Sequence, residues 1–272
     1  PDDKFNQEWL DRLNELMDKY EPDIIWFDNK MNIIGEKYRM LFLANFYNNA
    51  EKWGKEVVCT YKAKDMAEGS AVLDLERSRM SEMKPFPWLT DDSIDWDSWC
   101  YIDAARYKTT NRLIDFLVDV VSKNGAVLLN INPKANGEIP SETKERLLQM
   151  GQWLKLNGEA IYGTRTWNVY GEGPQKIVEG HLSEFKNSEA VAQDIRFTQK
   201  NGQLYAIALD WPEDGKLTIK TLKKGNPYIN NFESVSMLGC NDNLEFNQSD
   251  EGLVVTFPTE KPCDYAFVLK IN

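Results

Sequence analysis

A carboxylate at the end of an apolar run is the first candidate catalytic group in this sequence. Asp28 follows four large apolar residues, Ile24 to Phe27, and Pro22 interrupts any preceding helix. A short, uninterrupted apolar run between turn signals is typical of a strand buried on both faces, as in a parallel sheet. Asp28 is a candidate because parallel barrels carry their catalytic groups at the carboxyl ends of the strands. The alternative is a turn residue that closes the strand, since Asp and Asn are common in turns.

Two further apolar segments also end in charged residues. The segment EVVCTYK ends at Lys62, and AVLDLER places Glu76 at the tip of its strand. The carboxyl ends of parallel strands meet at one edge of a sheet, so we expect both side chains on the rim that holds Asp28. Trp26, two residues before Asp28, points to the same face by strand periodicity. A core tryptophan and a lysine in a structural ion pair are the alternatives.

The elements that position these residues alternate between helix and strand over residues 1–166. Their periodicity predicts helices over 5–19, 36–53, 107–123 and 141–157, and strands over 24–27, 57–60, 71–75 and 127–131. We expect the four strands to be parallel neighbours with helices outside them, as in a (β/α)8-type barrel. Residues 85–101 are expected to form an ordered loop with a short strand inside it. About four or five strands are fewer than the eight of a closed barrel, so the barrel is expected to lack its N-terminal strands.

From about Trp167 the pattern changes to alternating polar and apolar residues. Turn signals stand at Asn201-Gly202 and Asp214-Gly215. This pattern is typical of an antiparallel all-β domain of about a hundred residues, and we predict a β-sandwich. The fold class is therefore α/β plus all-β, with a catalytic barrel portion over residues 1–166 and a C-terminal sandwich over 167–272.

The composition narrows the classes of partner. A formal net charge of −11 without a basic cluster makes nucleic acid and anionic membranes poor partners, and no apolar stretch approaches the length of a membrane span. The four cysteines form no CxxC pair, although Cys240 and Cys263 are near enough in sequence to pair in an oxidising compartment. His181 is the single histidine, so a histidine-rich metal site is excluded. No metal or cofactor is expected.

Taken in order, several stretches resemble the α-L-fucosidases of glycoside hydrolase family 29. The stretches are YEPDIIWFDN, VVCTYK, AVLDLER, PWLTDDSIDWDSWCY, VDVVSKNGAVLLNINPKANGEIP, GQWLKLNGEAIYGTRTWNVYGEGP and QDIRFTQKNGQLYAIALDWP. The resemblance covers nearly the whole chain, including the sandwich. It implies a retaining exo-hydrolase that removes terminal α-L-fucose from glycans by double displacement, with two carboxylates about 5 Å apart.

The resemblance implies roles for particular residues. Asp28 matches the nucleophile in W-F-D, although Asn29 stands where the family usually has glycine. Some members carry the acid/base glutamate at the position of Leu89, whereas others use the glutamate of an L-D-x-E-R segment, which is Glu76 here. Glu76 is preferred to Glu82 because a strand end holds an acid more rigidly than a loop. Substrate contacts are implied for Trp26, Lys62 and Trp88.

One departure from the family is the lack of the histidines that, in the family, come from the first barrel strands and bind the fucose hydroxyls. Only His181 is present, and it lies beyond Trp167. The expectation is that the chain is part of a longer protein or a shortened form, and that a missing N-terminal barrel half or a homo-oligomer partner covers the open barrel. The implied partner is a fucosylated glycan, and the implied location is secreted, periplasmic or lysosomal. The alternatives are a non-catalytic carbohydrate-binding or scaffold protein on the same fold, and a different two-carboxylate glycosidase.

Overall fold

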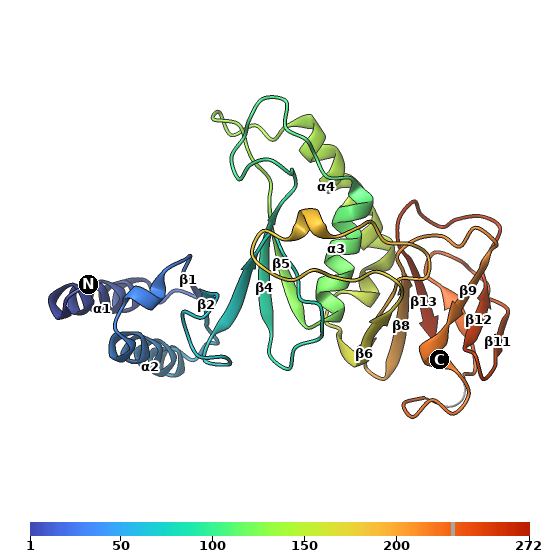
Figure 1. Ribbon diagram of the computed structural model, residues 1–272, viewed down its shortest axis with the longest axis horizontal. Coiled ribbons are helices and arrows are strands. Elements are labelled where there is room, and N and C mark those ends of the chain that lie inside the picture. Colours follow the sequence, from blue (N-terminus) through green and yellow to red (C-terminus); the bar gives the residue numbers. More distant parts are fainter. Residues whose placement is uncertain (230–231) are drawn as a thin grey trace. The chain divides into compact units, whose positions relative to one another are not determined.

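The computed structural model describes residues 1–229 and 232–272, which fall into two compact units (Figure 1). The first unit comprises Pro1–Glu76 and Phe86–Thr90, and the second comprises Arg77–Pro85 and Asp91–Asn272. The strand β4 (Trp88–Ser93) contributes its first half to one unit and its second half to the other.

The first unit is a parallel sheet with two long helices. The chain runs through α1 (Asp3–Tyr20), β1 (Ile24–Trp26), the short 3-10 turn η1 (Met31–Ile33), α2 (Glu36–Trp53), β2 (Val58–Lys62) and β3 (Val72–Glu76). β1 pairs in parallel with β2, and β2 pairs in parallel with β3. The start of β4 follows β3 in the strand order. The predicted parallel arrangement of the first three strands is confirmed.

Strand periodicity separates the two faces of this sheet. Ile25, Cys59 and Tyr61 are buried in one cluster with helix residues such as Phe42 and Phe46. The alternate positions, which include Trp26, Lys62 and Asp74, therefore belong to the opposite face. The sheet is thus buried and apolar toward the helices, and its other side carries the charged groups of Lys62 and Asp74.

Local signals set the ends of the helices. Asp2 caps α1 by accepting a hydrogen bond of 2.8 Å from the backbone N–H of Phe5. Gly54 ends α2 with a φ of 68°, a conformation that glycine adopts without a steric penalty. Asp2 thus fixes the start of α1, and Gly54 turns the chain from α2 back toward β2.

The second unit begins with the other half of β4, followed by α3 (Thr110–Ser122), β5 (Gly125–Asn130), α4 (Ser141–Asn157) and the 3-10 turn η2 (Gly158–Ala160). β5 follows β4 in the strand order, and the N–H of Ile94 bonds to the carbonyl of Asn130 at 3.0 Å. The short strand expected within residues 85–101 is β4, and it lies in the sheet between β3 and β5, which the sequence predicted as direct neighbours. The apolar run typical of a buried strand is interrupted in β4 because Asp91 and Asp92 occupy two of its buried positions.

The remainder of the second unit is an antiparallel sandwich, as predicted. One sheet has the order β10 (Val235–Met237), β13 (Phe267–Ile271), β8 (Gln203–Ala208), β7 (Ile195–Lys200) and β6 (Arg165–Glu172). The other has the order β11 (Phe246–Gln248), β12 (Leu253–Thr256) and β9 (Lys216–Ile219). Two 3-10 turns, η3 (Glu184–Lys186) and η4 (Lys220–Leu222), lie in the connections. Between β7 and β8, Asn201 and Gly202 form the predicted hairpin turn, both with positive φ. The chain is thus a portion of a (β/α) barrel followed by a β-sandwich.

The helices of the barrel portion pack on the sandwich within the second unit. Ile114 and Val118 of α3 and Trp153 of α4 share an apolar cluster with Ile207 of β8 and Val268 of β13. The indole Nε1 of Trp153 also donates to the carbonyl of Ala266 at 2.8 Å. For this reason the compact units divide the chain upstream of the 166/167 boundary, which stays a prediction.

Two further features concern the environment of the protein. None of the helices among the described residues is long and apolar enough to cross a membrane. All four cysteines carry free thiols, including Cys240 and Cys263, and both of these pack against the sandwich core. The thiol pKa of each is raised, first by burial.

Candidate active site

A buried lysine lies at the centre of three carboxylates in the first unit. Lys62 ends β2, and its side chain is 5% exposed. Its Nζ lies 3.1 Å from Oδ2 of Asp74, 3.9 Å from Oε2 of Glu76 and 4.0 Å from Oδ1 of Asp28. These contacts bring together three residues that the sequence predicted at one rim. The parallel register explains the arrangement because it sets Lys62 beside Asp74, two residues before Glu76.

Asp74 is the member of this group that the sequence did not single out. It is 1% exposed, and its Oδ2 accepts a hydrogen bond of 2.7 Å from the indole Nε1 of Trp26. The same oxygen faces the ammonium of Lys62, which lies 5.9 Å from the centre of the Trp26 ring. Asp74 therefore fixes both the lysine and the tryptophan. The signal was available, since Asp74 and Glu76 stand two positions apart on one strand and so share a face.

The two candidate catalytic carboxylates differ in exposure. Asp28 follows β1 by two residues, its side chain is 79% exposed, and Asn29 Nδ2 donates to its Oδ1 at 3.2 Å. Glu76 ends β3 with its side chain 16% exposed. Because one lysine atom contacts both groups, their nearest oxygens lie no more than about 8 Å apart, a range that includes the separation of about 5 Å in retaining glycosidases.

The other two candidates from the sequence lie elsewhere. Trp88 begins β4 and is 2% exposed, which leaves little of its ring surface open to a ligand. Its predicted substrate contact stays a prediction. Glu82 is exposed and belongs to the second unit, where the pKa of Tyr170 is raised first by burial and then by the charge of Glu82. Of the two glutamates, Glu76 is the one that contacts Lys62.

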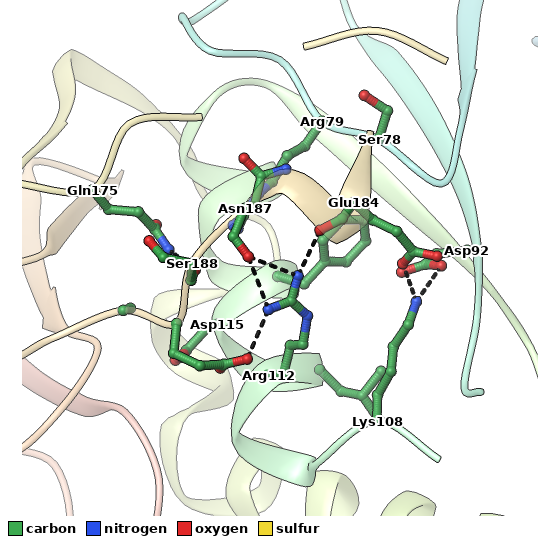
Figure 2. A pocket seen from close by; sticks show the side chains of 14 residues that line it. Ser78, Arg79, Asp92, Lys108, Arg112, Asp115, Gln175, Glu184, Asn187 and Ser188 are labelled. Atoms are coloured by element: carbon green, nitrogen blue, oxygen red, sulfur yellow. Dashed lines mark hydrogen bonds and ion pairs between the residues drawn. The ribbon is translucent and has the colours of Figure 1, made fainter. Parts of the chain in front are cut away.

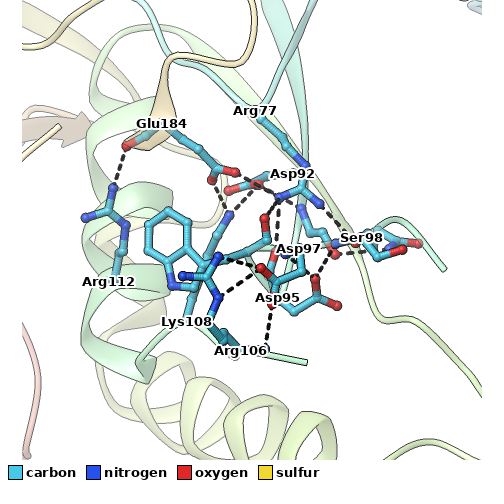
Figure 3. Close-up of polar contacts among 12 residues, drawn as sticks. Arg77, Asp92, Asp95, Asp97, Ser98, Arg106, Lys108, Arg112 and Glu184 are labelled. Atoms are coloured by element: carbon cyan, nitrogen blue, oxygen red, sulfur yellow. Dashed lines mark hydrogen bonds and ion pairs between the residues drawn. The ribbon is translucent and has the colours of Figure 1, made fainter. Parts of the chain in front are cut away.

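A second cluster of charged residues is buried in the second unit (Figure 3). The ammonium of Lys108 donates to Asp92 at 2.5 Å and also to Glu184, while Arg77 donates to Glu184 at 2.9 Å. Burial raises the pKa of Asp92 to about 6, against the opposing charge of Lys108. The cluster ties β4 and the start of α3 to the 3-10 turn at Glu184, so its role is structural.

A cavity beside this cluster is too small for a sugar (Figure 2). Its lining includes Arg79, Arg112, Asp115 and Asn187, and its volume is about 20 Å³. A space of that size holds about one water molecule. Among the described residues no group of three or more His, Cys, Asp or Glu side chains is arranged to hold a metal ion.

Comparisons with known proteins identify the family of the chain. The chain matches the family described as Alpha-L-fucosidase over residues 1–159, and the Alpha-L-fucosidase C-terminal domain over residues 187–272. It is 31% identical over 284 residues to the plasma alpha-L-fucosidase of Rattus norvegicus, covering 97% of this chain and 56% of that protein. It is 29% identical over 281 residues to the tissue alpha-L-fucosidase of Homo sapiens, covering 97% of this chain and 54% of that protein. The chain thus spans about half the length of these relatives.

A solved structure extends the likeness to the fold. The alpha-fucosidase of Thermotoga maritima in complex with fucose superposes with a TM-score of 0.73 at 25% identity. The alignment covers 100% of this chain and 57% of that chain.

Proposed function

We propose, from the premise that this chain belongs to the α-L-fucosidase family, that it hydrolyses terminal α-L-fucose from glycans or glycoconjugates. The observation that carries the proposal is the contact of Lys62 with both Asp28 and Glu76 at the carboxyl ends of parallel strands. In the family this rim is where the sugar is cleaved, and the chain presents there the two carboxylates that the reaction needs.

The proposed mechanism is a double displacement. The carboxylate of Asp28 attacks the anomeric carbon, and the bond to the leaving oxygen breaks while Glu76 gives that oxygen a proton. Glu76, now ionised, takes a proton from a water molecule, whose oxygen attacks the anomeric carbon and releases Asp28. Two inversions give fucose with retained configuration. The place of both carboxylates at strand ends, each within 4.0 Å of the Lys62 ammonium, supports this pairing of nucleophile and acid.

Lys62, Trp26 and Asp74 position the two carboxylates and the sugar. The ammonium of Lys62 lies about equally far from the proposed nucleophile and the proposed acid, so its charge acts on both carboxylates. Trp26 is 45% exposed and its ring lies 5.9 Å from the Lys62 ammonium, and an exposed indole suits packing against the apolar face of a sugar. Asp74 holds Trp26 through a hydrogen bond and Lys62 through an ion pair.

Exposed apolar side chains on β1 and β2 indicate that this face of the sheet is covered in the active molecule. Ile24, Trp26 and Val58 are 61%, 45% and 37% exposed on the face that carries the site. Apolar side chains at the interior of a barrel are normally covered by the remaining strands. We infer that further barrel strands, from a longer protein or from a second copy, cover this face in the active molecule. A location outside the cytosol, secreted, periplasmic or lysosomal, is proposed from the relative whose name places it in plasma.

Hydrolysis of an aryl α-L-fucoside tests the proposal, with Asp28→Asn as the variant and Asp23→Asn as its matched control. Asp23 precedes β1 as Asp28 follows it, and its side chain is also 79% exposed. We expect Asp28→Asn to retain sugar binding and lose turnover by about 10³-fold or more, because no glycosyl-enzyme forms. Asp23→Asn should keep the wild-type rate. A protein that binds fucose but never turns over the substrate would instead be a carbohydrate-binding protein on the same fold.

A further inference from the structure

A second cleft lies in the second unit, between the loop that follows β4 and the loop that follows β5. Its volume is about 840 Å³, which lies within the range of small-molecule sites. The first loop contributes five residues between Tyr101 and Tyr107, and the second contributes Lys134 and residues 138–140, followed by the start of α4. Both loops follow the carboxyl ends of their strands, the side on which barrel enzymes hold their ligands.

Aromatic and aliphatic side chains form the apolar part of this cleft. Tyr101 and Tyr107 supply two rings, and Ile102 and Ile139 are each 39% exposed in its wall. The hydroxyl of Tyr101 donates to Asp103 at 3.0 Å, a bond that orients the ring and raises the pKa of the phenol. The cleft therefore presents an oriented aromatic ring to its contents, as sites that stack on sugar faces do.

The polar part of the cleft carries balanced charges. Lys134 and Glu138 form an ion pair at 3.3 Å across a tight turn, and Gly137 allows that turn with a φ of 84°. Glu142 and Lys144 add one charge of each sign at the start of α4. Such a lining offers donors and acceptors together without a net charge. A neutral ligand with many hydroxyl groups can accept hydrogen bonds from the two lysines and donate to the two glutamates. A strongly charged ligand would be repelled by the two side chains of its own sign.

We propose that this cleft binds neutral sugar residues of an oligosaccharide. The inference rests on the proposed function for the choice of carbohydrate as ligand, and it adds a binding site of its own in the second unit. The ring of Tyr101 packs on a sugar face, and the pair of Lys134 and Glu138 exchanges hydrogen bonds with hydroxyl groups.

The test is binding of lactose and of N,N′-diacetylchitobiose, two neutral disaccharides without fucose, measured by saturation-transfer NMR and by titration calorimetry. We expect both sugars to bind the whole chain, and Tyr101→Ala to weaken binding about tenfold. Tyr101→Phe keeps the ring and should retain most of the affinity. Tyr162→Ala removes a tyrosine that is 60% exposed outside the cleft and should change nothing.

Two results would overturn the proposal. One is that neither disaccharide binds, and the other is that the wild type and Tyr101→Ala bind the disaccharides with equal affinity. Hydrolysis of the aryl fucoside is measured in the same samples. Disaccharide binding without hydrolysis, in a protein that carries the covering barrel strands, would refute the proposed function and retain this site, while hydrolysis without disaccharide binding would refute this site alone.

Discussion

Replacing Asp119 by asparagine should destabilise the second unit strongly. The side chain of Asp119 is fully buried in α3 and contacts three cations: Arg196 at 2.5 Å, Lys123 at 2.9 Å and Arg79 at 3.4 Å. Burial alone would raise the pKa of Asp119, but the three cations, Arg79 first, hold it well below its ordinary value. The carboxylate is therefore ionised in the fold and is the anion that all three cations share.

The size of the expected loss of stability follows from the burial of the three cations. The side chains of Arg79, Lys123 and Arg196 are 7%, 0% and 3% exposed, so water cannot replace the lost charge. Removing one member of a buried ion pair costs about 3–5 kcal/mol. For a unit of this size that cost lowers Tm by roughly 6–20 °C. The variant keeps the shape of the side chain, so the loss reports the charge.

Asp115→Asn is the matched control for this measurement. Asp115 lies one turn earlier on α3 and is 5% exposed, and Asn111 donates to it at 3.0 Å. Burial raises the pKa of Asp115 well above its ordinary value, so burial disfavours its charged form and a neutral amide costs less here than at Asp119. We expect a cost of about 1 kcal/mol for this change. Urea unfolding followed by circular dichroism compares the two variants at pH 7. Equal destabilisation by both would refute the reasoning.

The remaining predictions concern pH, the acid/base and the positioning of Trp26. Because the folded-state pKa of Asp92 is raised from 3.8 to about 6, the folded protein holds a proton that the unfolded chain releases. The free energy of unfolding should therefore fall as pH rises from about 4 to about 6. Urea midpoints across this window should show a smaller fall in Asp92→Asn, and an unchanged slope would contradict the assignment. Glu76→Ala should slow hydrolysis of poor leaving groups far more than that of activated aryl fucosides, which need little protonation. Equal losses would count against Glu76, and the same comparison on Glu82→Ala would then identify the acid. Asp74→Asn should lower kcat/KM by about 10–100-fold with the fold intact, because Lys62 and Trp26 lose their shared partner. Wild-type kinetics in that variant would remove Asp74 from the site.

Much of the fold could be predicted from the sequence because its signals are local. The runs at Ile24 and Val72 and the amphipathic pattern of α3 lie in continuous segments, and each gave an element of the expected type. The place of β4 in the sheet was not predicted because its buried positions include Asp91 and Asp92, whose burial depends on distant partners. Lys108 lies 16 positions from Asp92, and Glu184 lies 76 positions from Lys108.

The candidate site shows the same division. Asp28, Lys62 and Glu76 could be placed at one rim from strand ends alone, and the ion-pair distances agree with that placement. The contact of Trp26 with Asp74 joins residues 48 positions apart and depends on the parallel register of three strands. Strand register depends on packing across the whole sheet, so no short segment specifies it.

The identity of the residue that attacks the sugar is the claim on which the rest depends. It is tested most directly by treating the chain with 2-fluoro-fucosyl fluoride, which slows release of the covalent intermediate, and mapping the labelled peptide by mass spectrometry. We predict a single fucosyl ester on the peptide that contains Asp28, absent from Asp28→Asn and present in Asp23→Asn. A label on any other carboxylate, or hydrolysis with inverted configuration and no label, would contradict the assignment of Asp28 as the nucleophile.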